Sequence, residues 1–311
     1  MEELNFVHKP VLLDECINGL NIKPDGIYLD GTAGGAGHSS EIAKRLTDGG
    51  KLFSIDKDED AVATATERLK KYGCAEVVKG DYKDAKTLLS KKTDHIDGAL
   101  LDLGVSSFQL DSAERGFSYA KEGMLDMRMS KSGVSASDLV NTLTWQELAD
   151  ILRDYGEEPN AGLIARKIVA ARELGEITTT TQLTEIVTSA LPPAVRRKEK
   201  HPARRTFQAL RISVNNELEV LKEGLSNIFD MLAPGGRFCV ITFHSLEDRI
   251  VKQYFVSLEQ GCTCPKEFPV CVCGNKPKAK AINKKPIVAS EAECEENRRA
   301  RSAKLRIIEK I

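Results

Sequence analysis

The sequence predicts an α/β fold in which a parallel sheet is flanked by helices and an all-helical domain is inserted into the chain. Two observations predict it. Over residues 27–102, short apolar runs alternate with helix-like segments, as in consecutive βαβ units, and this alternation resumes in the last third of the chain. Residues 113–205 carry no clear strand pattern. We therefore expect an α/β domain made of residues 1–112 and 206–311, interrupted by a helical domain over 113–205.

The first strand and the turn after it carry the strongest local signal. Ile27–Leu29 is a short apolar run that leads into Asp30, and glycines follow at positions 31, 34, 35 and 37. A helix-like segment, Ser40–Leu46, comes next, so strand, tight turn and helix open a nucleotide-binding βαβ unit. Glycines let the backbone take positive φ and approach a ligand closely, and the start of the helix offers N–H groups. A tight turn without a ligand is the alternative.

The ligand expected at this turn is S-adenosylmethionine. The turn lacks both the dinucleotide fingerprint G-x-G-x-x-G and the P-loop pattern G-x-x-x-x-G-K-[ST]. An acid followed by a glycine-rich turn is typical of enzymes that use S-adenosylmethionine, and Asp30 would then lie near its ammonium group. A second strand, Lys51–Asp56, ends 21 residues after Gly35, where nucleotide-binding folds place a ribose-binding carboxylate.

The next elements continue the pattern. Asp58 can cap a helix that runs to Tyr72, and a strand follows over residues 75–78. The turn after this strand holds Tyr82, whose ring we expect to pack on the adenine base. Ile96–Asp102 is apolar enough to be a strand buried on both faces, and its terminal acid would lie over the crevice where α/β sheets bind ligands.

Helical signals dominate the middle of the chain. Three helices are predicted there, over residues 145–155, 161–174 and 181–190. A Thr-x-x-Glu capping box at residue 144 opens the first of them. The α/β pattern then resumes with one long helix, whose continuous apolar stripe runs from Val214 to Leu232. Two further strands follow, over 237–243 and, as an antiparallel edge strand, over 304–309.

Composition and charge restrict the class of protein. The 311-residue chain has a net charge of −1, so no overall field draws it to nucleic acid or to a membrane. Its N-terminus lacks the apolar run of a signal peptide, and no stretch approaches the ~18 apolar residues of a membrane span. Eight cysteines in such a chain indicate a reducing compartment, so we expect a cytoplasmic protein without a membrane partner.

Basic residues are nevertheless concentrated in three stretches of this neutral chain. They are Arg196, Arg197, Lys198, Lys200, Arg204, Arg205 and Arg211; Lys276, Lys278, Lys280, Lys284 and Lys285; and Arg298, Arg299, Arg301, Lys304 and Arg306. A single run of this kind is often a solvated surface, but three of them indicate a local site for a polyanion.

Several longer motifs make the chain similar to a known family. They are Val11–Glu15, the glycine turn, Leu101–Ser107, Glu114–Ser118, Leu125–Met129, His201–Ile212 and Phe243–Arg249. With these motifs the chain resembles the ribosomal RNA small-subunit methyltransferase H family, the 16S rRNA cytosine-N4 methyltransferases. The resemblance implies a Rossmann-like class I S-adenosylmethionine-dependent methyltransferase with a helical insertion that recognises the substrate. It also implies methyl transfer to the exocyclic N4 amine of a cytidine in the decoding region of 16S ribosomal RNA.

The resemblance also implies which residues bind the cofactor. Carried over to this chain, they are Gly35, Ala36, Gly37, His38, Asp56, Tyr82, Asp102 and Gln109. Two positions depart mildly from the family pattern. Tyr82 stands where many relatives carry Phe, which keeps the ring, and Ala36 stands in place of a glycine, which keeps a small side chain in the turn.

Asp102 is the candidate catalytic residue. The cytosine amine is a poor nucleophile, because its lone pair is delocalised into the ring, and a carboxylate is the natural acceptor for its N–H group. A cofactor-binding or structural acid is the alternative role. The chain lacks the Asp/Asn-Pro-Pro-aromatic motif of many amino-methyltransferases, so a ring that stacks on the base must come from elsewhere. Phe108 and Phe117 are candidates, although Phe is more often a core residue, and His244 is either a substrate contact or an ordinary hydrogen-bonded histidine.

Four clustered cysteines predict a zinc site. Cys262 and Cys264 form one C-x-C pair, and Cys271 and Cys273 form another after six intervening residues. Four thiolates suit tetrahedral zinc, and disulfides are not expected in a reducing cytosol. Zinc would order a basic hairpin next to the lysine run at 276–285. A surface loop without metal is the alternative.

Two other classes of function remain open at this point. A non-catalytic RNA-binding or assembly protein could have kept the fold, although it would not need a cofactor pocket. A nicotinamide dehydrogenase is disfavoured by the missing fingerprint. The sequence leaves open whether the substrate is free 16S ribosomal RNA or an assembled small subunit, and whether the chain forms a homodimer.

Overall fold

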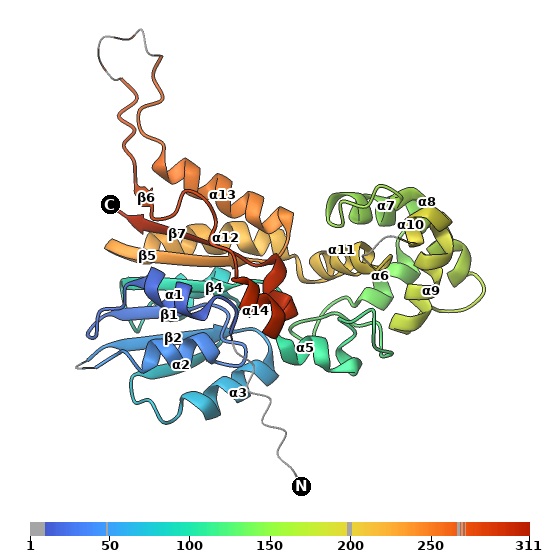
Figure 1. Cartoon of the computed structure of the whole chain (residues 1–311), viewed down its shortest axis with the longest axis horizontal. Helices are drawn as coiled ribbons and strands as arrows, with labels where there is room; N and C mark the ends of the chain where they lie inside the picture. Colours follow the sequence, from blue (N-terminus) through green and yellow to red (C-terminus); the bar gives the residue numbers. More distant parts are fainter. Residues whose placement is uncertain (1–9, 48, 198–200, 266–267, 269, 271) are drawn as a thin grey trace. The chain divides into compact units, whose positions relative to one another are not determined.

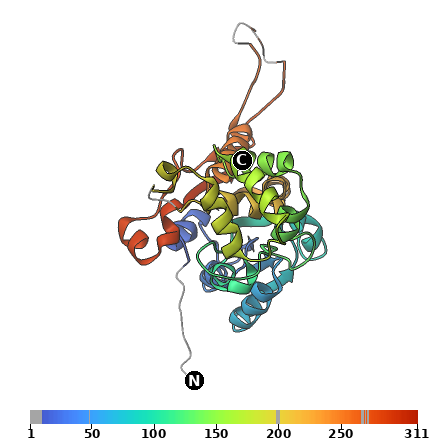
Figure 2. The ribbon, with the colours of Figure 1, turned by 90° about the vertical axis from the view of Figure 1, so that its right-hand side faces the viewer.

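The computed structural model describes residues 10–311 except 48, 198–200, 266–267, 269 and 271. The chain forms two compact units, which Figures 1 and 2 show in two views. The α/β unit comprises the residues up to Gly104 and those from Leu218 onward, and the helical unit comprises Val105–Glu217. Each unit has a hydrophobic core of its own.

A seven-stranded sheet forms the centre of the α/β unit. Its strands are β1 (Ile27–Asp30), β2 (Lys51–Asp56), β3 (Ala75–Lys79), β4 (Ile96–Asp102), β5 (Leu232–Thr242), β6 (Ala279–Ala281) and β7 (Lys304–Lys310), in the order β3-β2-β1-β4-β5-β7-β6. The first five strands are parallel, whereas β7 runs antiparallel to β5 and β6 antiparallel to β7. The strand order reverses between β1 and β4, as it does in Rossmann folds. The predicted fold, a Rossmann-like α/β sheet with an inserted helical domain, is confirmed.

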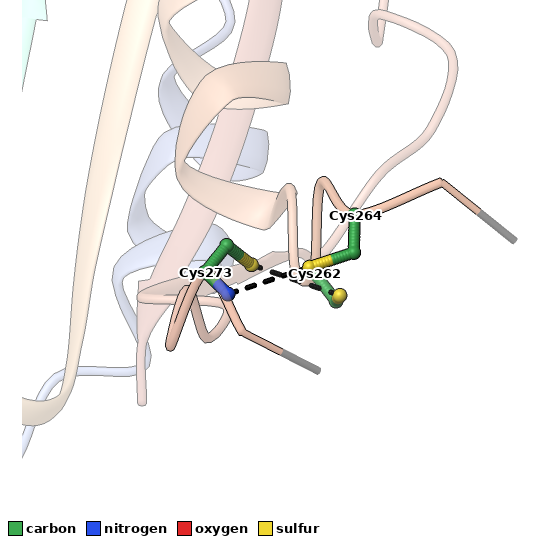
Figure 3. Close-up of side chains that lie close together, drawn as sticks. All are labelled: Cys262, Cys264 and Cys273. Atoms are coloured by element: carbon green, nitrogen blue, oxygen red, sulfur yellow. Dashed lines mark hydrogen bonds between the residues drawn. The ribbon is translucent and has the colours of Figure 1, made fainter. Parts of the chain in front are cut away.

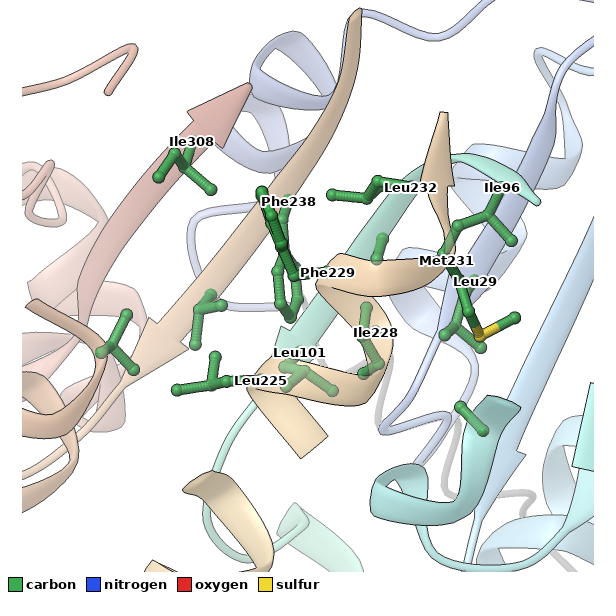
Figure 4. Close-up of a cluster of buried hydrophobic side chains, with 14 of the residues drawn as sticks. Leu29, Ile96, Leu101, Leu225, Ile228, Phe229, Met231, Leu232, Phe238 and Ile308 are labelled. Atoms are coloured by element: carbon green, nitrogen blue, oxygen red, sulfur yellow. The ribbon is translucent and has the colours of Figure 1, made fainter. Parts of the chain in front are cut away.

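Helices cover both faces of this sheet. They are α1 (Leu13–Leu20), α2 (Gly37–Ala43), α3 (Glu59–Leu69), α4 (Ala85–Leu89), α12 (Glu217–Met231), α13 (Ser245–Glu259) and α14 (Glu291–Glu296). Adjacent residues of a strand point to opposite faces, so Leu29 and Leu101 join one core cluster. Their neighbours Tyr28 and Leu100 join another. Figure 4 shows the first cluster between the sheet and α12, to which Phe229 contributes its ring. Burial on both faces explains why the strands read as continuous apolar runs.

The prediction of a single long helix through residues 214–232 is wrong. The chain instead forms α11 (Arg204–Asn215) and α12, and Asn216 between them takes a left-handed conformation with φ 50° and ψ 38°. Asparagine tolerates this conformation better than most residues, and the Asn216 N–H donates to the carbonyl oxygens of Ile212 and Ser213, which ends α11. The apolar stripe is therefore divided between two helices.

The last strand does not lie at the edge of the sheet, so this prediction is also wrong. β7 is antiparallel, as predicted, and pairs with β5, but β6 pairs with its other side from Ala279 opposite Lys310. β6 has only three residues, too few to show an alternating pattern. β5 also begins earlier than predicted, because Leu232 already pairs with Ile96 before the register shifts.

The helical unit contains seven helices among its described residues. They are α5 (Ser107–Asp111), α6 (Ala136–Thr142), α7 (Trp145–Asp154), α8 (Ala161–Arg172), α9 (Thr180–Ala190), α10 (Pro193–Arg196) and α11. The predicted capping box opens α7, since the Thr144 N–H donates to Glu147 Oε2 at 2.8 Å and the Glu147 N–H donates to Thr144 Oγ1 at 3.3 Å. The unit extends beyond the predicted limits 113–205, because Phe207 and Leu210 of α11 lie in its core. None of the helices that the structure describes has the length and apolar character needed to cross a bilayer.

Candidate active site

Three acids lie at the carboxyl ends of three neighbouring parallel strands. Asp30 ends β1, Asp56 ends β2 and Asp102 ends β4. β1 lies between the other two strands, with Asp30 paired in register with Ser54 and Leu100, so the three acids share one edge of the sheet. This edge is also where the strand order reverses, the place at which open α/β sheets bind ligands.

Asp30 organises the glycine turn from within. Its side chain is almost completely buried, and its Oδ2 accepts a hydrogen bond from Ser39 Oγ at 2.6 Å while its Oδ1 accepts one from the Thr32 N–H at 3.1 Å. Burial raises the pKa of this carboxyl, although both hydrogen bonds oppose the shift. Because Asp30 is almost completely buried and each of its oxygens has a partner within the chain, its carboxylate is not accessible for further hydrogen bonds.

Asp56 connects the end of β2 to the glycine turn. Its Oδ2 accepts from the Gly34 N–H at 2.8 Å, and its Oδ1 accepts from the Asp58 N–H at 2.9 Å. Burial raises the pKa of Asp56 to about 6, against the effect of these two donors. A carboxylate oxygen can accept more than one hydrogen bond, so Asp56 retains acceptor capacity beside the turn, as a ribose site requires.

Asp102 is the least satisfied of the three acids. Its side chain is 27% exposed as a whole, but its Oδ1 is buried and has no hydrogen-bond partner among the described residues. Burial raises the pKa of Asp102 to about 8, and the negative charges of Asp30 and Glu247 add to the shift. A buried polar atom without a partner is costly, so this oxygen indicates a missing proton, cation or ligand donor.

His38 faces Asp102 but does not neutralise it. Its Nε2 lies 3.1 Å from the Val11 carbonyl oxygen, which can only accept, so Nε2 carries the ring proton. Its Nδ1 lies 3.7 Å from Asp102 Oδ2, and burial lowers the pKa of His38 to about 4. The imidazole is therefore neutral near pH 7, and the acids at this edge have no cationic partner in His38.

Different structural constraints favour glycine at the different positions of the turn. Gly34 takes a positive φ of 48°, which favours glycine. A Cβ on Gly31 would lie 2.5 Å from Leu101 Cδ2, and one on Gly37 would lie 2.3 Å from Pro10 Cγ. The chain's own packing thus requires two of these glycines, and the tight-turn alternative explains that part of the pattern. Ala36 adopts φ 58° without being glycine.

Tyr82 lies beside the turn, where the sequence predicted it. It begins a short 3-10 helix after β3, Tyr82–Asp84. Its Cβ lies 2.9 Å from the place of a Cβ on Gly31, and its ring lies against Gly224 of α12, where a Cβ would be 2.4 Å from Tyr82 Cε2. The contact with α12 supports the ring next to the glycine turn.

Three predicted site residues belong to the helical unit. Gln109 is buried in α5, where its side-chain oxygen accepts from the Ser106 N–H at 3.0 Å in a capping box. Phe117 is 6% exposed and belongs to the core of the unit, as the more common role of Phe predicted. Phe108 is 56% exposed, so the same expectation is wrong for it.

His244 and Glu247 interact closely at the start of α13. The sequence analysis identified His244 as a candidate but missed Glu247. His244 caps α13, with its Nδ1 accepting from the Glu247 N–H at 3.4 Å and its Nε2 lying 3.1 Å from Glu247 Oε1. Glu247 is buried, and its Oε2 accepts from the Phe243 N–H at 2.8 Å. Its charge contributes to the raised pKa of Asp102. The sequence did contain a signal for Glu247, namely its position three residues after His244, which follows a strand and precedes a helix, as the two ends of a capping box do.

The predicted metal ligands lie elsewhere in the α/β unit. The sulfur atoms of Cys262, Cys264 and Cys273 lie within 4.8 Å of one another. Cys271 lies outside the described residues, so its predicted part in a metal site is not tested.

Comparison with known proteins gives one consistent result. Residues 5–311 match the MraW methylase family. The chain is 55% identical to "Ribosomal RNA small subunit methyltransferase H 2" of Agathobacter rectalis and 53% identical to "Ribosomal RNA small subunit methyltransferase H" of Lachnospira eligens, in each case over 99% of both chains. Among solved structures, an rRNA methylase from Streptococcus thermophilus matches 98% of this chain and 99% of its own length, with 10% identity and a TM-score of 0.44.

The raised pKa of Asp102 predicts a pH-dependent effect of Asp102→Asn on stability. A carboxyl whose pKa rises from 3.8 to about 8 on folding favours the folded state below its unfolded pKa. This contribution falls progressively as the pH rises above about 4 and is fully lost above about 8. Since asparagine resembles the protonated acid, we expect variant and wild type to have similar thermal midpoints near pH 4 and the variant to be increasingly more stable toward pH 9, as measured by scanning calorimetry without ligand.

The exposed residue Asp94 offers a matched control. Asp94→Asn removes a carboxylate from the same unit but should give no stability gain that grows toward pH 9. A difference between Asp102→Asn and wild type that stays constant from pH 5 to pH 9 would contradict the assignment of a raised pKa.

Proposed function

The chain belongs to the MraW methylase family, and on this premise we propose that it methylates the exocyclic N4 amine of a cytidine in the decoding region of 16S ribosomal RNA, with S-adenosylmethionine as methyl donor. The match over residues 5–311 and the two relatives at 55% and 53% identity confirm the family resemblance that the motifs indicated. The relatives' names refer to small-subunit ribosomal RNA, and this substrate is proposed for the present chain by inference from them.

The Oδ1 of Asp102, which is buried and has no hydrogen-bond partner in the part of the chain that the structure describes, is the observation that supports this proposal most directly. When bound, S-adenosylmethionine supplies an activated methyl group on a positively charged sulfonium. A positive charge at the edge shared by Asp30, Asp56 and Asp102 would offset the cost of burying these acids. The residues at this edge therefore fit a cationic donor better than an anionic dinucleotide.

In the predicted set of contacts, residues at different strand ends bind different parts of S-adenosylmethionine. Asp56 would accept from the ribose hydroxyls, and Tyr82, supported by α12, would pack on the adenine. Gly35–His38 would border the amino-acid end, with His38 contributing through its backbone because its ring faces Val11 and Asp102. We also propose that Gln109 contacts the cofactor, and this role is supported only by the resemblance of the sequence to the family.

Asp102 would act on the acceptor amine. Its carboxylate can accept a hydrogen bond from the cytosine N4 amine, which localises the nitrogen lone pair, and can then receive the proton that the amine loses. A nearby positive charge favours the ionised form of Asp102 and so lowers its pKa. With the donor bound, Asp102 would therefore be ionised and able to accept a proton. The alternative, an acid that only binds the cofactor, predicts loss of donor affinity with an unchanged rate at saturating donor.

The helical unit is proposed to recognise the RNA. Among its described basic residues, Arg197 is exposed and Arg205 is largely exposed, with a carboxylate oxygen of Glu158 only at 4.0 Å. Arg211 has a different role, because it makes two 2.8 Å hydrogen bonds with Glu217. Phe108 offers an exposed ring for stacking on a base. The substrate would be either 16S ribosomal RNA or the small subunit that contains it, in the cytoplasm.

A methylation assay with Asp102→Asn tests the function and the catalytic assignment together. The purified protein should transfer labelled methyl from S-adenosylmethionine to 16S RNA or small subunits from a strain that lacks the protein, and digestion followed by mass spectrometry should give N4-methylcytidine from the decoding region. Asp102→Asn should bind the donor more weakly, because it lacks the negative charge, and at saturating donor should lower the single-turnover rate by about a hundredfold or more, the usual contribution of a proton acceptor.

Asp94→Asn, which removes an exposed carboxylate, should methylate at the wild-type rate. Binding of RNA without any methyl transfer by wild type would support the non-catalytic alternative. A wild-type rate in Asp102→Asn would exclude the catalytic role, and a methyl group at another atom or another region of the RNA would exclude the proposed specificity.

The proposed RNA contacts predict a change in salt dependence. Replacing Arg197 and Arg205 together by glutamine should weaken RNA binding and lower the slope of log K against log salt concentration by about 0.7–0.9 for each phosphate that the variant no longer neutralises. Filter-binding titrations at several salt concentrations measure this slope. Arg153→Gln is the control, because Arg153 already contacts Asp150 and Asp154. Equal slopes for the double variant and wild type would remove these arginines from the RNA site.

A further inference from the structure

We propose that Cys262, Cys264 and Cys273 bind a structural zinc ion in the segment that connects α13 to β6. This segment leaves the end of α13 at Glu259 and returns to the sheet at Ala279. In both Figure 1 and Figure 2 it extends away from the sheet as two adjacent chain segments. Figure 3 shows that Cys262 and Cys264 come from the outgoing segment and Cys273 from the returning one.

The separations of the sulfur atoms fit a shared ion. All three lie within 4.8 Å of one another, and the sulfurs of Cys262 and Cys273 are 3.7 Å apart. Two thiolates bound to one tetrahedral zinc at ~2.3 Å lie about 3.8 Å from each other. A disulfide would need about 2.05 Å. The observed distance, which also allows an S–H···S hydrogen bond when no metal is bound, is therefore compatible with two ligands of one ion and too long for a covalent bond.

Backbone N–H groups also converge on the sulfurs. Cys264 Sγ accepts from the N–H groups of Val272 and Cys273, both at 3.3 Å. Cys273 Sγ accepts from the N–H groups of Thr263 and Asn275, both at 3.4 Å. A thiol is a weak acceptor, whereas a thiolate carries a negative charge that such donors stabilise. Donors around the ligand atoms are also the usual outer shell of a protein metal site.

The segment has little else to hold it in one conformation. Among the described residues from Cys262 to Lys278, all are exposed except Cys264, and the apolar Val272 is 73% exposed. Ordering a chain segment costs conformational entropy, which small units without a core commonly offset with a metal or a disulfide. A bound zinc ion would supply that stabilisation here.

The proposed zinc would have no part in methyl transfer. β6 pairs with the last residues of β7, and Glu309 of β7 pairs with Arg237 in the first half of β5. Asp102 instead pairs with Ile241 near the end of β5. The cysteine segment thus leaves the sheet at the end opposite the three acids. Zinc would fix the backbone that carries the exposed Lys276 and Lys278, which closely follow Cys273 in sequence.

Metal analysis of the full-length protein tests this site. Protein purified without chelator and supplied with Zn²⁺ should contain one zinc per chain after dialysis, and Cys264→Ser should contain almost none. Cys294→Ser, which removes a partly exposed cysteine of α14, is the matched control and should retain one zinc. One zinc per chain in Cys264→Ser, or none in the wild type, would overturn the proposal.

Cobalt substitution gives a second test that needs no folded variant. Wild-type protein loaded with Co²⁺ should show thiolate-to-cobalt charge-transfer absorption and the visible bands of a tetrahedral site. Removal of the metal should increase proteolysis between Glu259 and Ala279 while leaving the affinity for S-adenosylmethionine unchanged. Absence of the charge-transfer band, or loss of S-adenosylmethionine binding together with the metal, would contradict a structural thiolate site in this segment.

Discussion

The desolvation of three neighbouring acids at one edge of the sheet, one buried and two partly buried, is the constraint on which the proposed site depends. Parallel pairing of β1, β2 and β4 brings Asp30, Asp56 and Asp102 to the same edge of the sheet. Burial is the largest cause of the raised pKa at each of them, and His38, which faces Asp102, is neutral near pH 7. Backbone and hydroxyl donors of the turn satisfy Asp30 and Asp56. The remaining negative potential is relieved by a proton at Asp102 or by a cationic ligand.

The sequence predicted the parts of this arrangement that depend on local patterns. Each acid follows an apolar strand, so both the strands and their terminal carboxylates could be identified by reading along the chain. Other features depend on a single residue or on distant contacts. Asn216 ends a helix without interrupting its apolar pattern, and β6 is too short to show alternation. The effect of Glu247 on Asp102 follows only from the folded sheet.

The glycine turn shows why such motifs need a structure for their interpretation. Its glycines suggested room for a ligand, yet Gly31 and Gly37 are also required by close contacts with Leu101 and Pro10. The two C-x-C pairs show the opposite case. Their unusual spacing made a metal uncertain from sequence, whereas the sulfur separations and the backbone donors now support it. We infer that the chain separates donor binding, RNA recognition and zinc binding into three parts with different sources of stability.

Proton release on cofactor binding tests the central claim, that buried acids form a site for a cationic methyl donor. Titration calorimetry near pH 7 in buffers of different ionisation enthalpy measures it. With a pKa of about 8, Asp102 is mostly protonated without ligand, so S-adenosylmethionine should release a proton on binding, and its affinity should rise with pH until about 8. S-adenosylhomocysteine, which lacks the sulfonium charge, should release less. Equal proton release by both ligands, or an affinity for S-adenosylmethionine that does not change between pH 6 and pH 9, would contradict the account.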